Sequence, residues 1–122
     1  MHERIEELAE EYLDSAVILL SELISFPSVM GEKQDGMPFG EDCARVLEFA
    51  EEELSEEFVV HNFDNYAVTA QFDEREPELG ILCHLDVVPV EGQEWQTSPF
   101  EADIRDGRIY GRGAIDDKGP AR

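Results

Sequence analysis

The chain has 122 residues, the length of one domain with a single core. Its 42% hydrophobic content indicates a folded soluble protein, while 30 Asp and Glu against 9 Lys and Arg give a formal net charge of −21. So acidic a surface repels phosphate groups, which excludes nucleic-acid binding and electrostatic attachment to a membrane and favours a cation as partner.

The two cysteines, Cys43 and Cys83, form no CxxC motif, and we interpret both as small buried apolar residues. The longest early apolar run, residues 16–20, is too short to cross a bilayer. The acidic residues before it are not typical of a signal peptide. These features predict a cytoplasmic protein.

Two amphipathic helices are expected in the first half of the chain. From residue 3 to about 25, apolar residues recur at three- and four-residue spacing, and Phe26-Pro27 ends this helix. The same spacing returns over residues 40–54. Glycines and a proline between the two helices predict a surface loop over residues 28–38.

Strand-like patterns follow the second helix. We expect one hairpin over residues 58–70 with its turn at Asp64-Asn65, and another over residues 102–110 with its turn at 105–107. Between the hairpins, the apolar run 79–83 shows no alternation of apolar and polar residues. It therefore predicts a central strand that is covered on both faces.

At the end of this run, His84 and Asp86 offer an imidazole and a carboxylate two residues apart. In an extended strand both side chains leave the same face, about 6.6 Å apart. The pair is typical of a metal or catalytic site, but alone it equally fits a partly buried histidine beside a carboxylate.

The second motif is the glycine-rich stretch 111–120, which carries Asp116 and Asp117. It lacks the spacing of a phosphate-binding P-loop and the alternating ligands of an EF-hand. A carboxylate held where a strand ends and a helix begins is well placed to bind a metal ion. This second motif favours the metal-site interpretation of the first.

These motifs resemble the dinuclear zinc metallopeptidases, which include dipeptidases of the PepV and carnosinase type and the related acetylornithine deacetylase and succinyl-diaminopimelate desuccinylase. The resemblance extends through nearly the whole chain and implies an α/β fold. Residues 1–122 would be the N-terminal part of a zinc-peptidase-like catalytic domain, with a mixed sheet covered by helices and without the lid domain. Its anchors are His84-Leu85-Asp86-Val87-Val88-Pro89, Trp95, Ser98-Pro99-Phe100, Asp106-Gly107-Arg108-Ile109-Tyr110 and Gly111-Arg112-Gly113-Ala114-Ile115-Asp116-Asp117-Lys118-Gly119.

The resemblance implies a role for each matched residue. His84 would be a ligand of one metal ion, the catalytic residue Asp86 would orient its imidazole, and Asp116 would bridge two Zn²⁺ ions, which Mn²⁺ or Co²⁺ could replace. A carboxylate on the far ring nitrogen fixes the tautomer of a histidine ligand, and two carboxylate oxygens suit two neighbouring ions. The peptide bond between Asp116 and Asp117 is expected to be cis.

Other polar residues have no such role in this interpretation. Lys118 is interpreted as a surface or structural lysine, and Arg112 as a packing or ion-pairing residue. His2 and His61 match no motif of the family and are interpreted as structural or solvated.

The resemblance further implies the N-terminal segment of a metal-dependent dipeptidase that hydrolyses short peptides with a metal-bound hydroxide. The remaining ligands, including a Glu-Glu pair, are expected beyond Arg122, so the 122-residue chain alone is expected to be inactive and to expose apolar surface that favours self-association. Two alternatives stay open: a deacylase or desuccinylase of the same family, and a non-catalytic fragment or interaction module.

Overall fold

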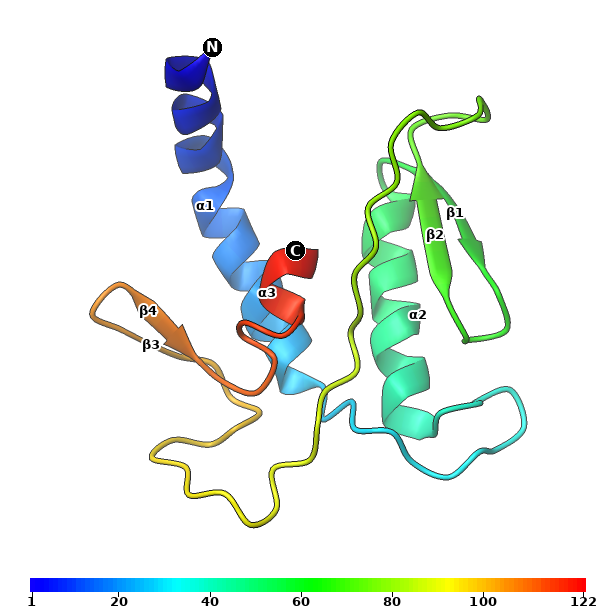
Figure 1. Ribbon diagram of the computed structural model, residues 1–122, viewed down its shortest axis with the longest axis vertical. Helices are drawn as coiled ribbons and strands as arrows, with labels where there is room; N and C mark the ends of the chain where they lie inside the picture. The colour runs from blue at the N-terminus through cyan, green and yellow to red at the C-terminus, as the bar shows by residue number, and fades with distance from the viewer.

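A computed structural model describes residues 1–122, with two long helices, two β-hairpins and a short helix near the C-terminus (Figure 1). The long helices are α1, His2–Ser25, and α2, Glu41–Ser55, as the apolar spacing predicted. Helix α1 ends at Phe26, whose backbone is extended because it precedes a proline. Helix α2 follows Gly40, where a φ of 90° favours glycine.

Both predicted hairpins are present. Strand β1, Val59–Asn62, pairs antiparallel with β2, Val68–Gln71, and β3, Asp103–Arg105, pairs antiparallel with β4, Arg108–Tyr110. Their turns contain residues with positive φ, as tight hairpin turns require. These residues are Asp64, Asn65, Asp106 and Gly107.

The expected central strand is wrong for this chain. Residues 79–83 form no strand, and each of the two sheets contains only its own two antiparallel strands. The expected single mixed sheet is therefore absent from residues 1–122. Because no strand lies on either side of the segment, Ile81 and Leu82 remain 87% and 98% exposed. Cys83 is exposed for the same reason, so the buried prediction is correct only for Cys43.

The buried apolar residues of the core are gathered at the second half of α1, at the beginning of α2 and in the segment after His84. They are Leu20, Leu23, Ile24, Cys43, Ala44, Val46 and Val87. The first turns of α1 extend away from the other elements in Figure 1, and Ile5 and Tyr12 there are exposed. None of the helices is long and apolar enough to cross a membrane.

The short helix α3, Lys118–Ala121, packs against α1. In Figure 1 it lies in front of the second half of α1. The glycine-rich stretch continues into α3, where Gly119 has no side chain and so leaves room for the carbonyl oxygen of Ala114. The second motif is thus held against the same helix end that contributes to the core.

Candidate metal centre

The structure brings His84 and Asp116 together although 32 residues separate them in the sequence. The imidazole Nε2 lies 3.0 Å from Oδ1 of Asp116. His84 follows the extended segment 79–83, and Asp116 lies in the turn between β4 and α3. Both side chains face solvent, with exposed fractions of 49% and 84%. The two predicted ligands therefore present one nitrogen and one carboxylate to the same point.

Asp86 contacts the other nitrogen of the ring. Nδ1 of His84 lies 3.0 Å from the carbonyl oxygen of Asp86 and 3.2 Å from its carboxylate. With a hydrogen on Nδ1, the imidazole donates to Asp86, and removal of the hydrogen that Nε2 shares with Asp116 would leave the Nε2 lone pair for a metal ion. The sequence predicted the contact of the imidazole with the Asp86 carboxylate but not its contact with the Asp86 carbonyl oxygen.

The pKa of His84 reflects this environment. Partial desolvation acts to lower the pKa of the imidazole, but the contacts with Asp86 and Asp116 outweigh it and raise the pKa above its ordinary value. A metal ion that binds Nε2 must therefore displace a proton that the two carboxylates help to retain.

Asp117 contributes a contact that the sequence did not reveal. The peptide bond between Asp116 and Asp117 is cis, as predicted. The Asp117 carboxylate accepts a hydrogen bond of 3.1 Å from the backbone N–H of His84. The adjacent acids of the motif thus divide their contacts, one facing the imidazole and the other holding the histidine backbone.

Lys118 is fully buried, so its interpretation as a structural residue fits the geometry and a surface position is excluded. Its Nζ donates a hydrogen bond of 2.8 Å to the carbonyl oxygen of Phe26. Desolvation by burial lowers the pKa of its ammonium group to about 8.

We expect the metal-free protein to become more stable between about pH 8 and pH 10.5 because of Lys118. The pKa of this lysine is about 8 in the folded state, against an ordinary value of 10.5, so over this interval the unfolded chain binds more protons and rising pH favours the folded state. This difference in the pKa of Lys118 corresponds to at most about 3 kcal/mol in the free energy of unfolding. Urea unfolding of the wild type and Lys118→Met at several pH values measures it. Parallel pH profiles for the two proteins would contradict the assignment.

The remaining residues singled out in the sequence lie apart from this centre. The Arg112 guanidinium lies 5.1 Å from the centroid of the Trp95 ring and donates to the carbonyl oxygen of Pro89, which agrees with a packing role. His2 and His61 are exposed on α1 and β1.

The donor set fits part of a zinc site. An imidazole whose Nδ1 is hydrogen-bonded and a carboxylate that faces its Nε2 are both ordinary zinc ligands. Residues 1–122 nevertheless contain no group of three or more His, Cys, Asp or Glu side chains placed to hold a metal ion. Zinc generally takes three or four protein ligands, so these residues supply only a portion of such a site.

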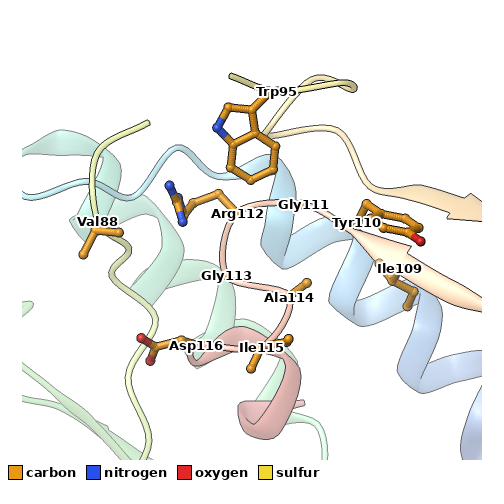
Figure 2. Close-up of a pocket in the computed structure, with 10 residues that line it drawn as sticks. All are labelled: Val88, Trp95, Ile109, Tyr110, Gly111, Arg112, Gly113, Ala114, Ile115 and Asp116. Carbon is orange, nitrogen blue, oxygen red and sulfur yellow. The ribbon is translucent and has the colours of Figure 1, made fainter. Parts of the chain in front are cut away.

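A mostly apolar cavity of about 320 Å³ adjoins Asp116 (Figure 2). Its wall is formed by residues 109–116 together with Val88 and Trp95. In Figure 2 the Asp116 side chain points toward the segment that carries Val88, and Trp95 lies beside Arg112 at the other end. The cavity therefore places apolar surface next to a predicted metal ligand.

Comparison with known proteins addresses the segment that holds both motifs. Residues 80–121 match the family model Peptidase family M20/M25/M40. The predicted resemblance to this metallopeptidase family is confirmed. The matched segment includes His84, Asp86 and Asp116.

The relatives of the chain are dipeptidases by name. The chain is 45% identical over 105 residues to the putative dipeptidase YtjP of Bacillus subtilis, a match that covers 81% of this chain and 22% of that protein. It is 38% identical over 122 residues to the Beta-Ala-Xaa dipeptidase of Lactobacillus delbrueckii subsp. lactis, covering 94% of this chain and 25% of that protein. The chain thus spans about a quarter of the length of these relatives.

The fold has a counterpart among solved structures. The crystal structure of human carnosine dipeptidase 1 superposes with a TM-score of 0.71 and 26% identity, covering 98% of this chain and 28% of that one. The expected α/β fold class, part of a peptidase catalytic domain, is confirmed, with two small antiparallel sheets in place of the mixed sheet. The helices and hairpins of this chain are therefore arranged as in part of that dipeptidase structure.

Proposed function

We propose that residues 1–122 are the N-terminal segment of the catalytic domain of a metal-dependent dipeptidase. The observation that carries the proposal is the 3.0 Å approach of His84 Nε2 to Asp116, which joins two distant motifs into one pair of donors. The match to the M20 peptidases and the names of the similar proteins support it. We place the enzyme in the cytoplasm and take dipeptides or short peptides as its substrates.

In this proposal, His84 would hold one of two metal ions through Nε2, and Asp116 would serve as a ligand to both. Zinc is the ion that this donor pair fits best, and Mn²⁺ or Co²⁺ is accommodated by the same donors. When bound, the ions supply Lewis acidity to a scissile carbonyl and to a water molecule.

The residues around these ligands have separate tasks. Asp86 accepts a hydrogen bond from Nδ1 of His84 and so favours the tautomer in which Nε2 can bind a metal ion. Asp117 holds the backbone of His84 through its N–H. The cavity beside Asp116 gives space for an apolar part of the substrate.

Substrate preference tests the proposal. The full-length enzyme, supplied with Zn²⁺ or Mn²⁺, should hydrolyse dipeptides and leave N-acyl amino acids largely intact, and a chelator should remove the activity. The reverse preference would favour the deacylase alternative. Metal-independent turnover would contradict both.

We expect the isolated 122-residue chain to show no peptidase activity with added zinc or manganese. Only two of the three or four protein ligands that zinc requires converge in it. A dipeptide hydrolysis assay on chain of verified mass, with the full-length enzyme as positive control, measures this. Metal-dependent turnover by the pure chain would overturn the expectation.

Sedimentation of the same sample would test whether exposed residues such as Ile81 and Leu82 drive self-association.

A further inference from the structure

Ser28 holds the segment that carries His84 and Asp86. Its side chain is fully buried, and its Oγ donates a hydrogen bond of 2.7 Å to the carbonyl oxygen of Leu85. Its own carbonyl oxygen accepts a hydrogen bond of 3.0 Å from the N–H of Val87. Ser28 therefore fixes the chain on both sides of Asp86, next to the imidazole.

Lys118 holds the segment that carries Asp116. It follows the Asp116-Asp117 pair directly, and its Nζ donates to Phe26, two residues before Ser28. The two motifs are thus attached to one short stretch of chain at the end of α1, residues 26–28, which we call the anchor segment.

The space around Gly113 shows how closely the two motifs approach each other. A Cβ atom built at Gly113 would lie 2.9 Å from Cδ of Lys118 and 3.0 Å from Cγ1 of Val87. Side chains from the two motifs therefore meet across a glycine that has no side chain of its own. The hydrogen bond from the His84 backbone N–H to the Asp117 carboxylate is a further contact between the two motifs.

We propose that Ser28 and Lys118 are positioning residues that, through the anchor segment, hold His84 and Asp116 at the separation needed to share a metal ion. Any effect on catalysis rests on the proposed function. The geometry of the proposal depends only on residues 26–28, 84–87 and 113–118. Neither side chain touches a predicted metal position: each bonds a backbone carbonyl oxygen instead. Their effect on the ligands is therefore indirect.

Ser28→Ala in the full-length enzyme tests the inference, with Ser21→Ala as a matched control. Ser21 also donates from Oγ to a backbone carbonyl, that of Val17, at 2.8 Å, but it lies within α1. We expect Ser28→Ala to weaken Zn²⁺ affinity, measured by competition calorimetry, by about 10–100-fold, as loss of an orienting partner does. Ser21→Ala should leave the affinity unchanged.

A spectroscopic measurement on the metal-free enzyme makes the test independent of peptidase activity. In the wild type, the ¹H and ¹⁵N signals of the His84 ring should report a contact of Nδ1 with Asp86 and one of Nε2 with Asp116, whereas Ser28→Ala should shift the Nδ1 signal because its contact with Asp86 is no longer held in place. Ser28→Thr retains the hydroxyl but crowds a buried site. It should therefore lose stability while it keeps the ring signals and the metal affinity.

Lys118→Met removes the second attachment, with the exposed Lys33→Met as its control. We expect a loss of affinity of similar size. The double variant Ser28→Ala/Lys118→Met should lose less than the product of the two single losses, because both act through the anchor segment.

The outcomes separate this inference from the proposed function. Unchanged ring signals and affinity in Ser28→Ala, with a stability loss equal to that of Ser21→Ala, would overturn the positioning role. Altered ring signals in Ser28→Ala, together with a wild type that binds metal but hydrolyses no peptide, would support positioning and overturn the peptidase proposal.

Discussion

Asp116→Asn is expected to remove nearly all metal-dependent activity from the full-length enzyme. The amide is almost the same size as the carboxylate, but it has no charge and only one oxygen, so it cannot bridge two ions. Because loss of an outer partner already costs about 10–100-fold in metal affinity, loss of a bridging ligand should cost at least about 100-fold. Calorimetry with Zn²⁺ and a dipeptide hydrolysis assay measure the two effects.

Asp106→Asn is the matched control for this substitution. Asp106 also lies in a turn, at a positive φ that asparagine tolerates, and it is not among the residues around His84. The Asp106→Asn variant should retain wild-type metal affinity and peptidase activity. If Asp116→Asn retained wild-type metal affinity, Asp116 would not be a ligand.

Gly119→Ala should destabilise the protein by about 3 kcal/mol, near the upper end for an overpacked site. A Cβ atom at this position would lie 2.0 Å from the carbonyl oxygen of Ala114, a backbone atom that cannot rotate away. The turn that carries Asp116 must then open, so metal affinity should decrease together with stability. Urea unfolding and calorimetry on the same variant measure both.

Gly80→Ala provides the comparison for Gly119→Ala. A Cβ atom there meets nothing within 4 Å, and its backbone does not require glycine. Its free energy of unfolding should stay within about 0.5 kcal/mol of the wild type. Equal stability of the Gly119→Ala and wild-type proteins would show that the turn is packed differently from the arrangement described above.

The sequence was sufficient for the features that depend on local pattern. The spacing of apolar residues located α1 and α2, and turn residues such as Asp64-Asn65 located the hairpins. The two motifs identified His84, Asp86 and Asp116 through their resemblance to a family, and the structure places these three side chains in contact. Their roles as ligands stay predictions.

The features that depend on contacts between distant segments were not predictable in the same way. Ser28 was assigned to a surface loop because glycine, proline and polar residues follow it, yet it is fully buried against Leu85. The burial of Lys118 likewise depends on Phe26, 92 residues earlier. Residues 79–83 have the composition of a covered strand, but composition cannot supply the neighbouring strands that cover it.

The bond between Lys118 and Phe26 has a consequence for the order in which the protein folds. Helix α1 leaves the ribosome before α3, and the carbonyl oxygen of Phe26 has no partner until 92 more residues have been synthesised. At about 5–20 residues per second, that interval is roughly 5–20 s. Local elements such as α2 and the β1–β2 hairpin form in microseconds, so His84 and Asp116 are brought together only after these elements have folded.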